Sequence, residues 1–331
     1  MAPLFAPFRA LGYIADDVPC SVHRLGKESF LVTSVGRTWQ LYRCDKLRLA
    51  LVGNLPTPSS SASRSGTNCD DDISVLASTG EFVFAAIGPR IAFFHRQYQV
   101  AHLEGHDEDV TCMLLFGDKL ISGARDGTLR VWHYKEYFHQ VQGATRQQGK
   151  ADVLEAAATI ALGSTGSGAS PTWLVHPDTY LDKVLVGCEG GSMQLWNIRT
   201  GRLIYSFAGW GCDVCSCEVS PALDVVGLGL ADGRVVLHNL RFDESVTTFR
   251  HATGAAIMGL SFRRDQREPT LAAADATGVI SVWDLEEQKL TSVIKDAHDG
   301  GITTLHFFLG EPVLLSVGRD NCVKMWIFDK A

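Results

Sequence analysis

Three cysteines, Cys212, Cys215 and Cys217, lie close enough together in the sequence to suggest a metal site. Thiolates at short spacing hold zinc when a second pair of Cys or His ligands follows downstream and completes a tetrahedral set. No such pair follows, because the other cysteines are scattered singly: Cys20, Cys44, Cys69, Cys112, Cys188 and Cys322. The spacing therefore predicts no metal site, and the three thiols need another explanation.

Two sets of residues carry the side chains of a hydrolase and share one spacing. They are His106, Ser122, Asp126 and Trp132, and then His298, Ser316, Asp320 and Trp326. In both sets the Ser precedes the Trp by ten residues and the Asp precedes it by six. A Ser, a His and an Asp in hydrogen-bonding series could activate a nucleophile. The duplication and the terminal Trp instead favour a structural network that satisfies its own polar groups.

The two sets belong to a longer repeat of seven segments, each a tight turn followed by an alternating strand. The segments end at Tyr42, Phe94, Trp132, Trp196, His238, Trp283 and Trp326, at intervals of 52, 38, 64, 42, 45 and 43 residues. Most intervals are close to the ~40–45-residue period of a WD40 blade. Sheets of short strands must stack to bury both faces, and a closed ring leaves no terminal face exposed. The sequence predicts an all-β fold, a seven-bladed WD40 β-propeller over residues 1–331.

Two polar insertions, at 56–72 and 140–171, account for the two long intervals. Both are expected to be mobile loops, the second with one short helix around 151–161. The seventh unit has only three strands before the chain ends, whereas "FRALGYI" at 8–14 precedes the first complete unit. This N-terminal stretch is predicted to complete the last blade, because an unpaired strand edge would otherwise remain at the seam.

Alignment of the first strands on Val110, Val214 and Ile302 explains the cysteines. Cys215 and Cys217 then occupy strand positions, where free Cys behaves as a small buried hydrophobe. Cys212 lies in the preceding loop and remains as a single thiol that could react.

The same alignment places Trp210 opposite His106 and His298, so that "GW" replaces "GH" in the fifth unit. Trp210 either fills the gap between blades or stands on the loop face as an aromatic anchor for a partner. Arg125 and Arg319, which precede the turn aspartates, are further candidates for a partner surface. The alternative is that both are solvated turn residues.

The composition describes a chain that can fold around a large core. Of its 331 residues, 46% are hydrophobic and 20% are charged,. No membrane-length apolar run and no secretory leader are evident, so the cysteines are expected to be reduced thiols of an intracellular protein. A net charge of −7 provides no basic footprint for nucleic acid phosphates,. Proteins are therefore the expected partners.

Beyond the blade pattern, the chain resembles the N-terminal propeller of the tandem-WD40 subunit of the UTP-B subcomplex of the small-subunit processome. The segments that carry the resemblance are "FRALGYI", "VTSVGRTWQLYRCDKLRL", "GWGCDVCSCEVSPALDVVGLGLADGRVVLHN" and "KMWIFD". The "SPALDVVGLGLADG" run is the most specific, since generic WD40 blades do not share it. The resemblance spans the whole chain.

This resemblance implies a non-enzymatic scaffold for protein–protein assembly in the nucleus, at the nucleolus. The scaffold would support processing of the small-subunit rRNA precursor together with a box C/D small nucleolar ribonucleoprotein. Its implied partners are other WD40 proteins of the UTP-B subcomplex and the pre-ribosomal particle, with local contact to pre-rRNA or small nucleolar RNA. No cofactor, no small-molecule substrate and no membrane are expected.

Two other classes of function stay open. A general WD40 adaptor, such as a ubiquitin-ligase substrate receptor or a signalling scaffold, would share the fold but not the "SPALDVVGLGLADG" run. A propeller enzyme would need clustered carboxylates or His ligands at the mouth of the channel, and the sequence gives no repeated set of that kind. Members of the resembled family carry a second propeller and a C-terminal helical region, so a chain ending at Ala331 is expected to be a fragment.

Overall fold

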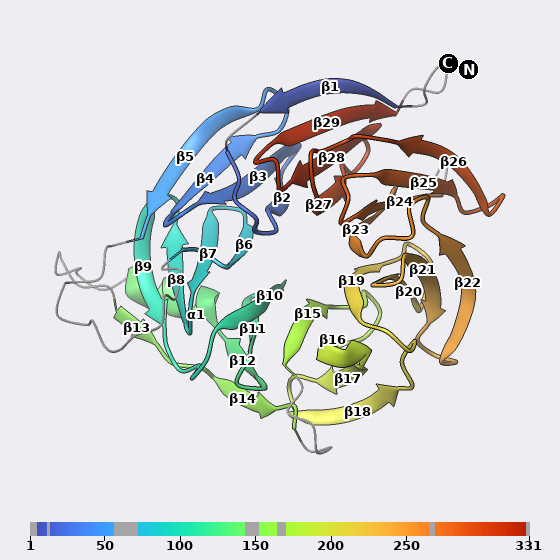
Figure 1. The fold of residues 1–331 in the computed structure, drawn as a ribbon. Helices are drawn as coiled ribbons and strands as arrows, with labels where there is room; N and C mark the ends of the chain where they lie inside the picture. The colour runs from blue at the N-terminus through green and yellow to red at the C-terminus, as the bar shows by residue number, and fades with distance from the viewer. Residues whose placement is uncertain are drawn as a thin grey trace, which may run out of the picture.

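The computed structural model describes residues 5–11, 14–55, 72–142, 152–163, 170–264 and 269–328. In these ranges the strands form seven sheets, which stand like blades around a central axis (Figure 1). The predicted all-β, seven-bladed propeller is confirmed. Within the described ranges, no helix has the length and apolar character that a membrane crossing requires.

Each blade contains a meander of four strands, and the sheet of the second blade has a fifth strand, β13 (Asp152–Leu154), beside its outer strand. The first strands surround the central channel (Figure 1): β2 (Ser21–Leu25), β6 (Val75–Thr79), β10 (Val110–Phe116), β15 (Pro171–Val175), β19 (Val214–Val219), β23 (Ile257–Phe262) and β27 (Ile302–Phe307). The second strands are β3 (Glu28–Val35), β7 (Phe82–Ile87), β11 (Lys119–Ala124), β16 (Lys183–Cys188), β20 (Val225–Leu230), β24 (Thr270–Asp275) and β28 (Val313–Gly318). The third strands are β4 (Thr38–Arg43), β8 (Arg90–His95), β12 (Thr128–Trp132), β17 (Met193–Asn197), β21 (Arg234–Asn239), β25 (Ile280–Asp284) and β29 (Val323–Phe328). The outer strands are β5 (Arg48–Asn54), β9 (Tyr98–Leu103), β14 (Ala158–Ala161), β18 (Arg202–Phe207), β22 (Glu244–Arg250), β26 (Lys289–Ile294) and β1 (Phe5–Leu11).

The core lies between the blades. Five consecutive residues of β11 and of β28 are buried, because each of these strands is covered on both faces by a neighbouring sheet,. The seven residues that end the sequence repeat all lie on third strands, and Trp132, Trp196, Trp283 and Trp326 are buried there. Each unit of the sequence repeat therefore contributes one aromatic or His side chain to the core between blades.

Five of the first strands contain a β-bulge at the same place. In β10, β19 and β27 the register shifts directly after Val110, Val214 and Ile302, and β15 and β23 show the same shift. A bulge leaves one residue unpaired and changes the direction in which its side chain points. The alignment on these three residues therefore matches the structure, and the bulge position is the one that Cys215 occupies in the fifth blade.

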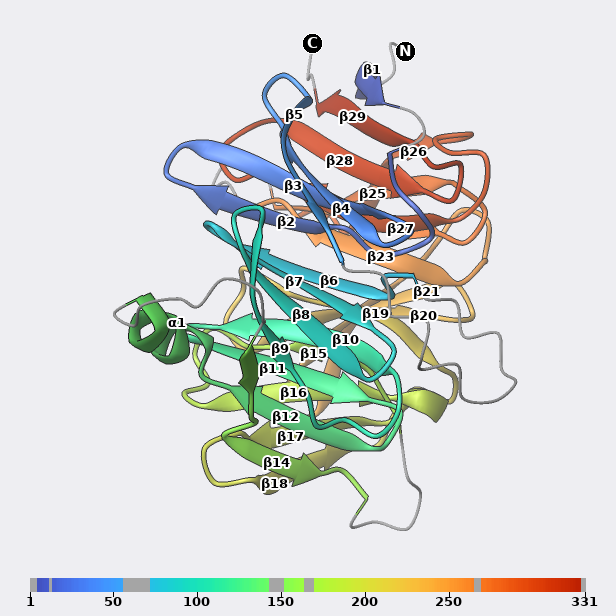
Figure 2. The same ribbon diagram turned by 90° about the vertical axis from the view of Figure 1, so that its left-hand side faces the viewer.

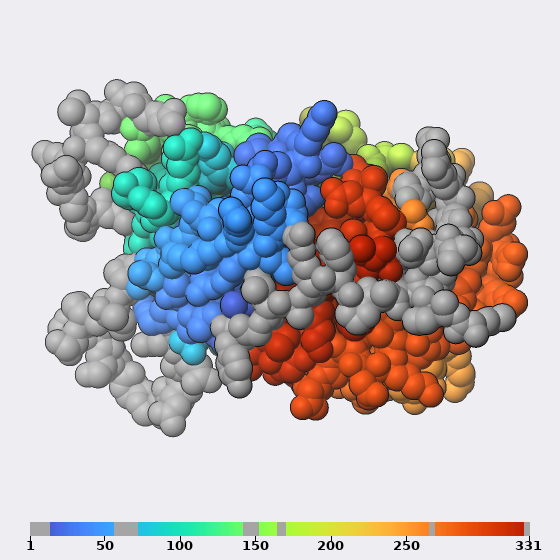
Figure 3. All heavy atoms as spheres, turned by 90° about the horizontal axis from the view of Figure 1, so that it is seen from above, coloured from blue at the N-terminus to red at the C-terminus, as the bar shows by residue number. Residues whose placement is uncertain are grey.

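An N-terminal strand closes the ring. β1 pairs antiparallel with β29, from Phe5 opposite Phe328 to Leu11 opposite Val323 (Figure 1). The predicted closure is confirmed, with the strand at 5–11 rather than at 8–14. In Figure 3 the blue surface of the first blade adjoins the red surface of the last, so these two blades are neighbours in the closed ring.

The structure corrects the expectation of a helix around 151–161. Residues 152–154 form β13, which pairs in parallel with β9, and residues 158–161 form β14, the outer strand of the third blade. Helix α1 (Tyr134–Gln142) precedes them and projects from one flat face of the ring (Figure 2). The alanine-rich segment is extended because β12 would otherwise present an unpaired edge, and tertiary pairing overrides helix propensity. Of the first insertion, predicted at 56–72, all but the last residue lies outside the described residues.

Candidate functional site

The third blade joins its four predicted residues in one chain of hydrogen bonds. The Trp132 indole N–H donates to Ser122 Oγ at 2.9 Å, and Ser122 Oγ lies 2.8 Å from His106 Nε2. His106 Nδ1 lies 3.0 Å from Asp126 Oδ2. Because an ionised carboxylate can only accept, Nδ1 carries the imidazole proton and Nε2 accepts from the serine hydroxyl.

The seventh blade repeats this arrangement. Trp326 Nε1 donates to Ser316 Oγ at 2.9 Å, His298 Nε2 lies 2.7 Å from that oxygen, and His298 Nδ1 lies 2.8 Å from Asp320 Oδ1. Gly318 allows the loop to approach, because a Cβ at this position would lie 2.4 Å from His298 Nδ1,. In both blades the aspartate also accepts the backbone N–H of the residue after the histidine. Each network thus fastens the loop before the first strand to the turn before the third.

Burial decides the charge states in these networks. It lowers the pKa of His106 and of His298, and the hydrogen bond and the charge of the adjacent aspartate oppose that shift only in part,. Burial also acts to raise the pKa of Asp126 and Asp320, but the hydrogen bonds that these carboxylates accept outweigh it and lower both values. At neutral pH each pair is a neutral imidazole beside an ionised carboxylate.

These networks cannot present a nucleophile. Ser122 and Ser316 have a relative exposure of 0%. Each hydroxyl oxygen already accepts from a buried indole and faces a histidine, so no substrate carbonyl can approach it. The geometry suits loop fixation, in which every buried polar group has its partner.

The sixth blade contains a third polar network, which the sequence analysis missed. Asp275 is fully buried and accepts hydrogen bonds from the hydroxyls of Thr253 and Thr277. His251 Nδ1 lies 3.2 Å from Thr253 Oγ1 and 3.5 Å from Asp275 Oδ2. Its Nε2 lies 3.3 Å from the Ala273 carbonyl oxygen. This set too ties a loop histidine to a buried aspartate.

The missed network departs from the spacing on which the sequence search relied. Ala273 stands ten residues before Trp283, where the other two blades carry serine, and its backbone carbonyl takes over the partner role. Asp275 precedes Trp283 by eight residues instead of six. A search for a loop His followed by an Asp near the turn, with no serine required, would have found it.

In the fifth blade Trp210 packs inward. Its ring meets the edge of the buried His238 ring at a centroid distance of 5.0 Å and an interplanar angle of 89°. Asp232, six residues before His238, pairs with Arg234 at 2.6 Å, and Arg234 Nη2 donates to the Trp210 carbonyl oxygen at 2.9 Å. These contacts favour the gap-filling interpretation of Trp210 over the partner anchor.

The cysteine cluster divides as the alignment predicts. Cys215 and Cys217 lie on β19 as predicted, but both are only partly buried. Burial still raises the pKa of both thiols, so they are protonated at neutral pH,. Cys212 lies in the preceding loop, partly buried, with its sulfur 3.7 Å from Arg234 Nη2. In the part of the chain that the structure describes, which leaves out Cys69, no group of three His, Cys, Asp or Glu residues is placed to hold a metal ion.

The two candidate arginines lie on different blades from each other and from Trp210. Arg319 donates to Asp17 Oδ1 at 2.8 Å, and both side chains are about half exposed. It borders a hollow of about 170 Å³ that is also lined by the bulge residues Cys215 and Thr303. Arg125 is exposed, and within the described ranges its side chain makes no hydrogen bond or ion pair. The structure therefore does not assemble the three candidates into one surface.

The fold and these positions can be compared with known proteins. The sequence model of the family described as "WDR36/Utp21 first beta-propeller" matches residues 31–329. The chain belongs to the WDR36/Utp21 family. The match covers all seven blades apart from β1, β2 and a few flanking residues, so the family's first propeller is the unit seen in Figure 1.

Three relatives in the WDR36/Utp21 family align along nearly the whole chain. WD repeat-containing protein 36 of Homo sapiens is 35% identical over 329 residues, which cover 98% of this chain and 33% of the human protein. U3 small nucleolar RNA-associated protein 21 homolog of Schizosaccharomyces pombe is 30% identical with the same coverage. U3 small nucleolar RNA-associated protein 21 of Saccharomyces cerevisiae is 28% identical over 98% of this chain and 32% of its own length. The chain thus spans about a third of the length of these relatives.

Among solved structures, a chain of "Crystal Structure of Mitotic Checkpoint Complex" superposes with a TM-score of 0.76. The two sequences are 16% identical, and the match covers 98% of this chain and 92% of that one. This likeness shows the shared fold alone.

Proposed function

We propose that this chain is a non-enzymatic scaffold propeller of the small-subunit processome, acting in the nucleolus in the processing of the small-subunit rRNA precursor. The observation that carries the proposal is the match of nearly the whole chain to the first propeller of the WDR36/Utp21 family. Two relatives that align over its length are named as U3 small nucleolar RNA-associated proteins. U3 small nucleolar RNA-associated protein 12 of Saccharomyces cerevisiae also aligns, at 28% identity over 128 residues.

The partners that we propose are chiefly proteins, namely the other WD40 proteins of the UTP-B subcomplex. A net charge of −7 is unfavourable for broad contact with a phosphate backbone,. Contact with pre-rRNA or with a box C/D small nucleolar RNA would then be local. Rigid blades fastened by buried networks are suited to holding several such partners in fixed positions.

Affinity purification of the whole protein that contains this chain tests the proposal. The tagged protein should recover UTP-B subunits and the box C/D RNA. When the salt concentration is raised, the RNA should leave before the proteins, because phosphate contacts weaken steeply with salt and apolar interfaces do not. Depletion of the protein should let unprocessed small-subunit rRNA precursor accumulate, with the large-subunit rRNA spared.

The competing function is that of a general adaptor. Recovery of a ubiquitin-ligase core or of a membrane signalling complex, with the rRNA precursors unchanged on depletion, would replace the scaffold proposal by the adaptor.

A further inference from the structure

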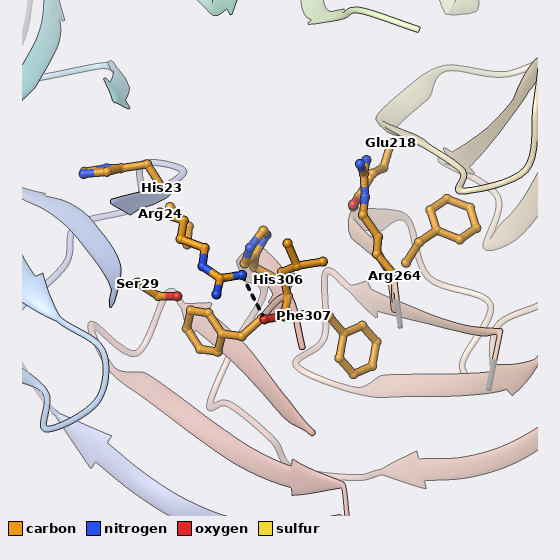
Figure 4. Close-up of a pocket in the computed structure, with 11 residues that line it drawn as sticks. His23, Arg24, Ser29, Glu218, Arg264, His306 and Phe307 are labelled. Atoms are coloured by element: carbon orange, nitrogen blue, oxygen red, sulfur yellow. Dashed lines mark hydrogen bonds between the residues drawn. The ribbon is translucent and has the colours of Figure 1, made fainter. Parts of the chain in front are cut away.

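A pocket of about 250 Å³ lies at one end of the central channel. It is on the face that carries the turns between the first and second strands of the blades, hereafter the lower face. Side chains reach the pocket from the first strands of four blades or from the residues directly after them: Arg24, Glu218, Arg264, His306 and Leu309 are among them (Figure 4). The fixed loops with His106 and His298 belong to the opposite face.

Two arginines bring positive charge to this pocket. Arg24 donates to the Gly26 carbonyl oxygen at 3.1 Å and to the Leu309 carbonyl oxygen at 3.4 Å. Arg264 donates to the Val219 carbonyl oxygen at 3.4 Å, and its side chain is 43% exposed. In Figure 4 the two arginines approach from opposite sides with His306 between them. A guanidinium has five N–H donors, so both arginines keep donors available for a ligand.

The other titratable groups of the pocket leave this positive charge largely uncompensated. Burial raises the pKa of Glu218, which lies beside Arg264, to about 8, so its carboxyl is mostly protonated at neutral pH. Burial lowers the pKa of His306 to about 4, so the imidazole is neutral. The Asp178 side chain, 3.7 Å from Arg264, is 70% exposed on the rim, where solvent screens its interaction with the arginine,.

Apolar side chains line part of the pocket and are exposed elsewhere on the lower face. Phe262, Phe307 and Phe308 form part of the pocket lining. Exposed leucines occur at or near the turn between the first and second strands of four blades: Leu25 at 49%, Leu181 at 81%, Leu223 at 67% and Leu309 at 52% exposure. They belong to blades one and seven on one side of the channel and to blades four and five on the other. Exposed apolar side chains around a polar centre are a feature of protein-binding surfaces.

We infer that the lower-face pocket binds a carboxylate side chain presented by an apolar segment of a partner protein. Arg24 and Arg264 would donate to the carboxylate, and leucines on both sides of the channel would contact apolar residues that flank it. Because these leucines lie on opposite sides of the central channel and only Leu309 lines the pocket itself, the occupant is an internal segment that crosses the channel mouth, not a chain end. An RNA phosphate fits less well, since an RNA strand needs a track of cations and this pocket offers two beside a carboxylate on its rim.

Peptide selection on the 331-residue chain tests this inference. A phage-displayed library of random dodecapeptides would be selected on the chain at pH 7. It would be counter-selected on the Arg24→Gln/Arg264→Gln double variant. Enriched peptides should contain Asp or Glu flanked by Leu, Ile or Phe. In fluorescence anisotropy, a capped synthetic copy of the leading peptide should bind the double variant at least about tenfold more weakly, and Leu309→Ser should weaken binding severalfold.

Matched controls distinguish binding in the pocket from a general loss of positive charge or of folded structure. Arg202→Gln removes an exposed arginine from β18, the outer strand of the fourth blade, and should leave the peptide affinity unchanged. A copy of the peptide with its acidic residues replaced by amides should lose binding to the original chain. Circular dichroism should give the same thermal transition for the double variant as for the original chain, since both arginine side chains are solvent-accessible.

Three outcomes would overturn the inference: selected peptides without acidic residues, peptides that bind the double variant equally well, or an oligouridylate that displaces the peptide and binds more tightly. The inference rests on the proposed scaffold function only in naming a protein as the ligand. Because peptide selection uses the isolated chain, it can fail while UTP-B subunits are still recovered from cells, and the reverse also holds.

Discussion

Asp126 accepts four hydrogen bonds, from His106, from the Asp107 backbone and from the backbone and hydroxyl of Thr128. Its side chain is 7% exposed, so water cannot replace these contacts. We expect Asp126→Ala to lower the free energy of unfolding by roughly 1–3 kcal/mol, because buried donors lose their acceptor. Urea denaturation measures this loss. Asp118→Ala, at an exposed turn of the same blade, is the control, and equal midpoints for the two variants would refute the loop-fixing role.

His306 gives a pH dependence of stability with a defined sign. Its folded-state pKa is about 4, chiefly because of burial, whereas an unfolded histidine titrates near 6.5,. Between these values the unfolded chain binds a proton that the folded chain does not. The contribution of His306 to stability is therefore complete above about pH 6.5 and is lost as the pH falls towards 4, by at most about 1.4 kcal/mol per pH unit.

Urea titrations at several pH values between 7 and 4.5 measure this dependence. His306→Gln should show a shallower fall in unfolding free energy than the original chain. His139→Gln, at an exposed position of α1, should show the original slope. If His306→Gln and the original chain lost stability in parallel, the neutral buried state of His306 would be wrong.

At the scale of elements, β1 is the strand that the ring needs for closure. Without it, β29 would expose a row of unpaired backbone groups, which invites pairing with other chains,. We expect deletion of residues 1–11 to lower the melting temperature by about 5 °C or more and to produce concentration-dependent oligomers. Differential scanning calorimetry and light scattering measure these effects, with deletion of residues 1–4 as the control. A monomer with an unchanged melting temperature would count against the closure role.

At the scale of the molecule, the clusters of the core each span neighbouring blades, so no blade has a core of its own. One cluster, for example, combines Leu129 of β12 with Val184 of β16. Because the sheets share their buried faces around a closed ring, we expect the propeller to unfold as one cooperative unit. Asp126→Ala in the third blade and Asp320→Ala in the seventh should each shift the same single transition.

The double variant tests this cooperativity. The two sites lie on different blades and share no partner in the described chain, so their losses should add within about 0.5 kcal/mol,. Calorimetry should show one transition for each single variant and for the double variant. A second, earlier transition that appears only with Asp126→Ala would mean that the third blade unfolds by itself.

Much of the architecture follows from local sequence patterns. The turn-and-strand repeat predicted the number of blades. It could do so because alternating hydrophobic residues and turn residues are local signals, which lie within a few positions of one another in the sequence. The third-blade and seventh-blade networks could be found because each keeps its Ser and its Asp at fixed offsets from a Trp. The sixth-blade network escaped because a backbone carbonyl, which has no sequence identity, replaces the serine. The strand at 158–161 escaped because its extended form depends on the free edge of β12,.

By itself, the sequence determined the ring of seven blades, the side chains at their interfaces and the strand that closes the seam. The period of the hydrophobic residues and the strand edge left without a partner can both be identified from the sequence. The lower-face pocket could be found only in the tertiary structure, because its residues are far apart in the sequence. Arg24 and Leu309, which touch there, are 285 residues apart in sequence. The protonation of Glu218 and His306 likewise arises from burial that no local pattern encodes, because it depends on how the first strands converge at the channel,. Closure of the ring brings these residues together, and their chemistry exists only once it has closed.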